Sequence, residues 1–319
     1  MLQDIPHNIF VFTVCTAQQY PFAKVLAESL PSTVAFKVGV LEATLTESNT
    51  VALEDLSLPN LSQMRERYDT AAFMAAIVPF FGAYFLGQKG VEKVIYVDPT
   101  VQFFGDLEDI IAALQSADIL LTPRITKKFG EAAYGDEKLF LNTGMYDAGF
   151  WAVRKTDNTL RFLHWWQARL ADRAHFDLCN GMNHAQLWLN YVPIFFDKVM
   201  VNKNLGWNVG LQNLHERVLT RHNQKWVVNL SELLVFVNFR EMMDESRAVK
   251  TLIGQSAAEA LVKEYRNQLK KYSNTYPNLF SLYQAINPKT SVWRNALRQK
   301  IQALIAAINH FPTYHKSIK

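Results

Sequence analysis

Short apolar runs alternate with amphipathic stretches along the first two thirds of the chain. The runs are rich in β-branched and aromatic residues and hold few charges, which is typical of strands buried on both faces; they cover residues 8–15, 33–41, 94–97 and 117–122. Helical spacing of apolar positions predicts helices at residues 21–30, 68–87, 107–115, 157–173 and 255–271. This alternation predicts an α/β domain built on a mostly parallel sheet.

Asp98-Pro99 ends the most apolar of these predicted strands. Proline cannot donate to a strand ladder, and it holds the residue before it in an extended conformation. A carboxylate is therefore expected at the carboxyl end of a central strand, the edge at which open α/β sheets bind ligands. The alternative is that Asp98 caps the following helix, although that helix is predicted to begin several residues later, near Gly105.

Composition narrows the function classes. The 319 residues are 49% hydrophobic and 13% aromatic, which suits a packed core, and a net charge of +4 from 33 basic and 29 acidic residues is too balanced for a nucleic-acid binder. The two cysteines, Cys15 and Cys179, fit a reducing compartment better than a disulfide scaffold. No Gly-x-Gly-x-x-Gly motif occurs, which argues against a hydride-transfer enzyme.

Residues 1–7 carry no signal-peptide pattern, so we expect a cytoplasmic protein. Residues 71–87 hold no charge, but they are slightly fewer than the roughly 20 that a membrane span needs. Pro79 and Gly82 lie in their middle, so we predict a core helix, with membrane contact as the alternative.

The last amphipathic stretch, residues 291–311, has a flank of basic side chains. Such a helix can lie on an anionic membrane, which would place the protein at the inner face of the membrane. It can equally dock on its own domain or on a second subunit, so peripheral membrane contact and a homodimer both stay open. We expect a nucleotide-sugar-binding domain at residues 1–245 and a helical extension at residues 246–319.

The segment Tyr96-Val97-Asp98-Pro99-Thr100 resembles the Tyr-Leu-Asp-Pro-Asp segment of bacterial GT-A glycosyltransferases of the glycogenin and lipopolysaccharide galactosyltransferase group. In that family the first carboxylate approaches the ribose of a sugar nucleotide, and the last binds the divalent metal that bridges the diphosphate. The resemblance spans roughly residues 8–240. It implies the GT-A fold, a nucleotide-diphospho-sugar donor, a glycan or lipid-linked acceptor, and transfer with retention of configuration.

Further segments resemble the same family, at residues 139–154, 183–193, 199–217 and 233–240. The most specific match lies within residues 199–217 and runs from Asn208-Val209 through Leu214-His215-Glu216-Arg217. By this resemblance, Asp147 and Gln186 are the candidate catalytic residues. Candidate donor-binding residues lie in the first loop, on the Asp98 segment and on later strands; they are Thr13, Cys15, Thr16, Ala17, Asp98, Thr100, Arg124, Asn208, Asn238 and Arg240.

Four positions depart from the family pattern. Thr100 and Asn238 stand where relatives carry metal ligands, Val78 where they carry Lys, and Ala185 where they carry Asp. Since neutral oxygens hold Mg²⁺ or Mn²⁺ poorly, we predict weak or absent metal binding and assign no metal ligand.

Two hypotheses follow from these departures. In the first, cationic side chains replace the metal, because an arginine fork matches phosphate oxygens; the candidates are Arg124, Lys127, Arg154 and Arg240. In the second, the protein is a binding or scaffold module without transferase activity. A peripheral membrane scaffold is a further alternative, which rests only on residues 291–311.

Overall fold

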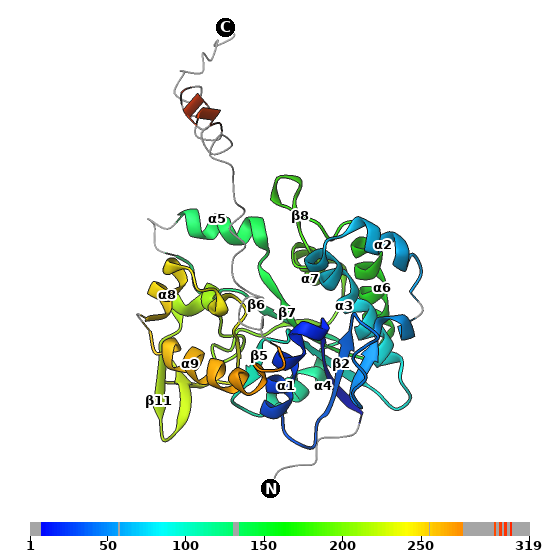
Figure 1. The fold of residues 1–319 in the computed structure, drawn as a ribbon, viewed down its shortest axis with the longest axis horizontal. Coiled ribbons are helices and arrows are strands. Elements are labelled where there is room, and N and C mark those ends of the chain that lie inside the picture. The colour runs from blue at the N-terminus through cyan, green and yellow to red at the C-terminus, as the bar shows by residue number, and fades with distance from the viewer. Residues whose placement is uncertain are drawn as a thin grey trace. The chain divides into compact units, whose positions relative to one another are not determined.

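The structure is a computed structural model. It describes residues 8–276, apart from 57, 130–133 and 255, and six residues between 297 and 307 (Figure 1). Residues 1–283 form one compact unit and residues 284–319 a second.

A seven-stranded sheet forms the centre of the first unit. Its strand order is β10 (Val199–Val201), β6 (Ile119–Pro123), β7 (Tyr146–Arg154), β4 (Lys93–Val97), β1 (Ile9–Cys15), β2 (Ala35–Val40) and β3 (Thr50–Ala52). β7 runs antiparallel to β4 and β6, and the other neighbouring pairs are parallel. The predicted fold class, a mixed and mostly parallel sheet flanked by helices, is therefore confirmed.

Two layers of helices bury the faces of this sheet. On one face, α3 (Thr70–Gly87) and α6 (Asp157–Leu170) pack side by side and share an aromatic core with Phe12 and Trp151. On the other face, α1 (Tyr20–Ser29) and α4 (Glu108–Ser116) bury Leu26 and Ile110. The central strands β1, β4 and β6 are buried on both sides, as their continuous apolar runs predict, whereas the edge strands β3 and β10 are partly buried.

Smaller elements complete the unit. The helices are α2 (Leu61–Arg67), α5 (Tyr134–Thr143), α7 (Val192–Phe195), α8 (Arg247–Gly254) and α9 (Ala258–Leu269). Antiparallel pairs join β5 (Val101–Phe103) to β14 (Phe236–Asn238) and β8 (Phe176–Asp177) to β9 (Met182–Asn183), and a small sheet joins β11 (Leu219–His222), β12 (Lys225–Val228) and β13 (Glu232–Leu233).

Three local expectations from the sequence differ from the structure: a strand within residues 139–154, a helix at residues 183–191, and Asp157 as the N-cap of the helix at residues 157–173. The first part of residues 139–154 belongs to the helix α5, and only its second part is the strand β7. Residues 183–191 form the end of β9 and a 3-10 turn, η4 (Leu187–Tyr191), instead of one continuous helix. The N-cap of α6 is Thr156, whose hydroxyl accepts a hydrogen bond from Thr159 N, and Asp157 lies inside the first turn.

The long apolar helix α3 is a core element. It has the length and hydropathy of a membrane span, but 56% of it is buried inside the protein. Its Pro79 carbonyl accepts a hydrogen bond from Gln167 Nε2 of α6 at 3.0 Å. The neighbouring helix therefore satisfies a polar group of α3, as expected for a helix that packs against protein.

The predicted division at residue 245 stays a prediction. α8 and α9 share a hydrophobic cluster with Phe22 and Val25 of α1, and they lie in the unit that extends to Tyr283. Of residues 291–311, the structure describes only Leu297, Lys300, Ile301, Ala303, Leu304 and Ala307, which are helical. The remainder of the predicted amphipathic helix lies outside the described residues.

Asp118 provides a test of how this fold responds to pH. Arg154 Nη2 lies 2.6 Å from Asp118 Oδ1, and Asn158 Nδ2 donates to Oδ2 at 3.3 Å. Burial opposes the charge of Asp118, but hydrogen bonds from Arg154, Thr156 and Asn158 outweigh it and lower the pKa of this carboxyl. The pair therefore stabilises the folded state above the ordinary pKa of Asp, about 4, and that stability is lost as pH falls through the folded-state pKa.

We expect Asp118→Asn to lower the free energy of unfolding by about 1–3 kcal/mol at pH 7, with a smaller difference from wild type at pH 3. Urea unfolding at the two pH values measures this. The control is Asp172→Asn, which breaks an exposed pair with Arg173 and should change stability by less than about 0.5 kcal/mol. A difference for Asp118→Asn that is the same at both pH values would contradict this account.

Candidate functional site

Asp98 follows β4 at the carboxyl edge of the sheet, as the sequence predicts, and only 3% of its side-chain surface is exposed. Its Oδ1 accepts hydrogen bonds from Thr100 N at 3.0 Å and from Thr100 Oγ1 at 2.6 Å. Its Oδ2 lies 3.2 Å from Arg240 Nη1. The alternative role as a helix cap is wrong, because α4 has Leu107 at its N-cap.

Thr100 and Asn238, the two positions that the resemblance assigns to metal ligands, are neighbours. The antiparallel pair β5–β14 sets Asn238 opposite Val101, and Thr100 Oγ1 lies 3.1 Å from Asn238 Oδ1. That same Oδ1 accepts a hydrogen bond from Arg240 N at 3.1 Å. The structure therefore brings Asp98, Thr100, Asn238 and Arg240 together, although they come from distant parts of the sequence.

This donor set fits a divalent cation poorly. It contains one carboxylate, Asp98, which is paired with Arg240, and the other two side chains are neutral. Within the described residues, no group of three or more His, Cys, Asp or Glu side chains is placed to hold a metal ion. A hard cation such as Mg²⁺ prefers anionic oxygen ligands and gives up its water reluctantly.

Asp147 and Asn208 form a second buried group beside this one. Asp147 Oδ1 accepts a hydrogen bond from Gly149 N at 2.7 Å, and Oδ2 accepts from Asn208 Nδ2 at 2.8 Å and Gln212 Nε2 at 3.5 Å. Asn208 Nδ2 also lies 3.2 Å from Thr122 Oγ1. Asn208 Oδ1 is buried and has no hydrogen-bond partner among the described residues, so one acceptor of the site stays unsatisfied within the protein.

Gly149 joins the two groups. Its carbonyl accepts a hydrogen bond from Asp98 N at 2.7 Å. A Cβ at this position would lie 2.9 Å from Asn238 Nδ2, 3.0 Å from Asp147 Oδ1 and 3.5 Å from Asp98 Cβ. The close approach that this glycine permits is therefore to the protein's own polar side chains, and it brings Asp98 and Asp147 against one backbone segment.

Arg124 is buried and lies on the loop after β6. Its Nη1 donates to Thr143 Oγ1 at 2.6 Å, its guanidinium lies over the ring of Phe140 at 5.1 Å, and its Nη2 is 3.8 Å from Glu241 Oε1. Burial raises the pKa of Glu241; the charge of Arg124 opposes this rise and that of Asp147 adds to it. The charges around the site thus include two arginines and three carboxylates.

The run Asn213 to Arg217 holds the loop that carries Arg124. Asn213 Nδ2 donates to the carbonyls of Arg124 at 3.1 Å and Asn208 at 3.0 Å. The buried carboxylate of Glu216 accepts hydrogen bonds from Thr126 N at 3.0 Å and from Lys127 N at 2.6 Å. In this chain, Asn213 and Glu216, which belong to the most specific match to the resembled family, therefore support the loop structurally.

Glu216 is paired in turn with a buried arginine. Arg217 Nε lies 3.6 Å from Glu216 Oε1, and Arg217 Nη1 donates to the carbonyl of Trp207. Burial lowers the pKa of Arg217 to about 10, against the opposing charge of Glu216. Arg217 stays protonated at neutral pH, so it balances the carboxylate that holds the loop.

Gln186 contacts Thr143, the last residue of α5. Its Nε2 donates to the carbonyl of Thr143 at 2.6 Å, and Asn183 Nδ2 donates to the same oxygen at 2.7 Å. Thr143 therefore links Gln186 to Arg124 through one residue. The catalytic roles of Gln186 and Asp147 stay predictions.

The first loop begins at the end of β1. Thr13 and Cys15 are fully buried, Thr13 Oγ1 has no partner among the described residues, and burial with the charges of Glu42 and Asp98 raises the pKa of Cys15, which keeps it a thiol. Thr16 caps the turn Ala17–Gln19, and Ala17 N donates to Glu42 Oε2 at 2.8 Å. The predicted role of these four residues in donor binding stays a prediction.

The suggestion that Arg154 belongs to this site is wrong. β7 runs antiparallel to β4, so Arg154 lies opposite Lys93, at the beginning of β4, whereas Asp98 follows its end. Arg154 pairs with Asp118 there. Val78 and Ala185 lie in the hydrophobic cluster under the sheet, 7% and 5% exposed, so they contribute no polar group to the site.

Sequence reasoning missed three polar side chains of this region, Glu42, Gln212 and Glu241. Glu241 directly follows Arg240, and Gln212 directly precedes Asn213. Their positions next to residues that the sequence already singles out could have identified both. Glu42 follows β2 at the same sheet edge as Asp98, which parallel strands predict.

Comparison with known proteins finds similarity in structure only. No protein-family model and no curated protein sequence matches the chain. The galactosyltransferase LgtC, solved with donor and acceptor sugar analogues, is 15% identical over 63% of this chain and 75% of its own length, with a TM-score of 0.41.

Two further glycosyltransferases are similar at the same level. One is involved in glycosylation of the major capsid of PBCV-1; it is 12% identical over 76% of this chain and 98% of its own, with a TM-score of 0.44. The other is GlyE of Streptococcus pneumoniae, also 12% identical, over 83% of this chain and 63% of its own, with a TM-score of 0.44. These overlaps are too loose to assign an activity, so the function is argued from the residues of this chain.

The crowding around Gly149 gives a testable prediction. We expect Gly149→Ala to lower the free energy of unfolding by about 1–3 kcal/mol, because the added methyl would displace Asn238 or Asp147. Thermal or urea unfolding measures the change. Gly87→Ala is the matched control: its added methyl meets nothing within 4 Å, so we expect no loss of stability. Equal stability of the Gly149→Ala variant and wild type would show that the site is looser than described.

Proposed function

We propose that this chain is a glycosyltransferase of GT-A type that binds a nucleotide-diphospho-sugar without a metal ion and transfers the sugar to a glycan or lipid-linked acceptor. The observation that carries the proposal is the contact between Arg240 and Asp98 at the carboxyl edge of β4. The resemblance implies a metal held at positions 100 and 238, which are next to this carboxylate, and here Arg240 contacts both Asp98 and Asn238.

The chemistry of the transfer sets what these residues would do. When the bond between sugar and diphosphate breaks, negative charge builds on the leaving phosphate oxygen and positive charge on the sugar ring. Arg240 has 54% of its side-chain surface exposed, so an anion can reach its guanidinium from solvent. Fixed donors that face a developing negative charge stabilise it without reorganisation.

Asp147 has the complementary role in this proposal. Three N–H groups hold its carboxylate in place, and Asn208 keeps a buried oxygen without a partner among the described residues. A carboxylate positioned in this way can stabilise positive charge on the sugar ring.

A second function, nucleotide-sugar binding without transfer, is favoured by Val78 and Ala185. Both positions carry polar residues in the resembled family, and both are hydrophobic core here. The site therefore has fewer polar groups for catalysis than the resemblance implies. Cleavage of the donor distinguishes the two functions.

Titration with uridine and guanosine diphosphates in EDTA tests the proposal. We expect saturable binding without added metal, and about tenfold weaker binding by Arg240→Ala, equivalent to about 1.4 kcal/mol. Arg221→Ala is the matched control, because Arg221 is also 54% exposed and pairs with one carboxylate, that of Glu264, at 3.3 Å. Binding that requires Mn²⁺ would refute the metal-free site, and no binding of either nucleotide would refute the proposal. Release of nucleotide from a sugar nucleotide separates transfer from binding alone.

Glu241 predicts the pH dependence of this binding. Its side chain is 52% exposed, and partial burial raises its pKa; a diphosphate beside it would repel the charged form further, so binding should favour protonated Glu241. We expect affinity for the diphosphate to fall more steeply in wild type than in Glu241→Gln as pH rises above the ordinary pKa of Glu, about 4.3, and the variant to bind more tightly at neutral pH. The variant removes the contribution of Glu241 and leaves the titration of the ligand itself. Parallel pH profiles would contradict this role.

A further inference from the structure

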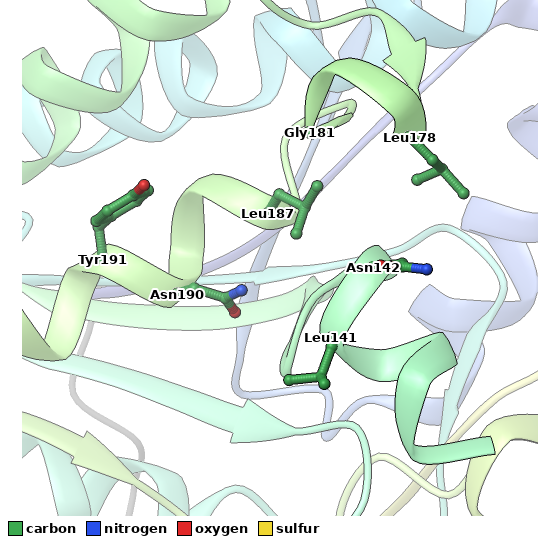
Figure 2. A pocket seen from close by; sticks show the side chains of 7 residues that line it. All are labelled: Leu141, Asn142, Leu178, Gly181, Leu187, Asn190 and Tyr191. Atoms are coloured by element: carbon green, nitrogen blue, oxygen red, sulfur yellow. The ribbon is translucent and has the colours of Figure 1, made fainter. Parts of the chain in front are cut away.

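A small pocket lies in the first unit, and its lining residues are distant in sequence from Asp98. Its walls come from the end of α5, from the loop after β8, and from η4, as Figure 2 shows; the lining residues are Leu141, Asn142, Leu178, Gly181, Leu187, Asn190 and Tyr191. Its volume of about 240 Å³ is below the range of about 300–1,000 Å³ typical of sites for drug-sized ligands. The pocket therefore suits a single small ring or the end of a chain.

The lining excludes a charged ligand. It contains no Lys, Arg, His, Asp or Glu side chain, so nothing in it would neutralise a phosphate or a carboxylate. Asn142 is exposed and has no side-chain hydrogen bond within the described part of the chain, and Asn190 contributes a second amide. Two amides without a charge suit a neutral ligand that carries hydroxyl groups.

The orientation of Asn190 is set by the protein. Its Oδ1 accepts a hydrogen bond from Met145 N at 3.0 Å, which identifies the oxygen and leaves Nδ2 as the donor on the other side. Nδ2 has no acceptor among the residues that the structure describes. A ligand hydroxyl that accepted from this group would meet a donor already held in position.

The remaining walls are apolar and include an aromatic ring. Tyr191 is 46% exposed, and its ring stacks on that of Phe195 at 5.1 Å, which restricts its motion. Leu141 is 69% exposed and Leu178 is 38% exposed, although both are large apolar side chains. A sugar ring presents hydroxyls at its edge and C–H groups on its faces, so it matches amides beside leucines and tyrosine.

We propose that this pocket binds one neutral sugar residue of a glycan. Its role as a subsite for the acceptor, away from the reacting end, rests on the proposed function; sugar binding itself does not. The pocket adjoins the candidate site through Thr143, which follows Asn142. Thr143 accepts hydrogen bonds from Arg124 Nη1 at 2.6 Å and from Gln186 Nε2 at 2.6 Å, so the wall of the pocket and the buried arginine share one residue.

The test is titration of the full chain, without nucleotide, against glucose, galactose, mannose, N-acetylglucosamine and their neutral disaccharides, observed by saturation-transfer NMR. We expect saturable binding of at least one of these sugars. Asn190→Asp keeps the oxygen that accepts from Met145 N but removes the Nδ2 donor, and it should weaken binding about tenfold. Tyr191→Ala should weaken binding by a similar factor. Ile194→Ala, which truncates a 76% exposed side chain outside the lining, is the control and should bind as wild type does.

Thermal unfolding of each variant checks that the fold is intact, and diphosphate titration of Asn190→Asp should give the wild-type affinity. Loss of sugar binding with intact diphosphate binding therefore supports the subsite separately from the donor site. If no sugar binds, or if both variants bind as wild type does, the inference is wrong even where the diphosphate binds. Sedimentation with anionic vesicles that Tyr191→Ala abolishes would assign the surface to a membrane and overturn the sugar site.

Discussion

Asp98 lies at the carboxyl end of a central strand with 3% of its side-chain surface exposed, and a carboxylate buried to this degree requires donors around it. Thr100 supplies two of them from the next turn, and Arg240, which is distant in sequence, supplies a positive charge. These contacts require β14 to lie against β5, because only that pairing brings residues 238–240 beside residue 100. The segment that follows β14 is therefore connected to the centre of the sheet through one buried carboxylate.

The sequence predicts much of this arrangement because parallel strands align their carboxyl ends. The apolar runs predicted the strands β1, β2, β4 and β6, and Asp98-Pro99 identified the carboxyl edge of the sheet. The prediction for Arg154 failed because apolar patterning carries no strand direction, and β7 is antiparallel. The same limit applies to α5: the residues from Leu139 to Thr143 are as apolar as a strand, and tertiary context makes them helical.

The residues that match the resembled family are explained better by the hydrogen bonds they make within this protein than by a catalytic role. Asn213 and Glu216 satisfy backbone groups of the loop from Arg124 to Lys127, and no local pattern in the sequence links these two segments. Likewise, Asp147 accepts hydrogen bonds from Gly149 N, 2 residues away, and from Asn208 Nδ2, 61 residues away. Pairings of this kind arise only when the strands are in place, so they are not readable from composition or spacing.

Two of the four departures from the family pattern, Thr100 and Asn238, are consistent with an arginine in place of the metal. A guanidinium carries one positive charge where a divalent ion carries two, so it compensates a diphosphate less. A carboxylate at position 100 would then stay close to the ligand without a divalent ion to neutralise it, and its repulsion would oppose binding. Thr100 removes that charge, and its hydroxyl donates to Asp98 at 2.6 Å. Asn238 likewise keeps an oxygen for Arg240 N, at 3.1 Å, without adding a titratable group. Neutral side chains at these two positions therefore suit a site in which arginine side chains, and not a divalent ion, supply the positive charge.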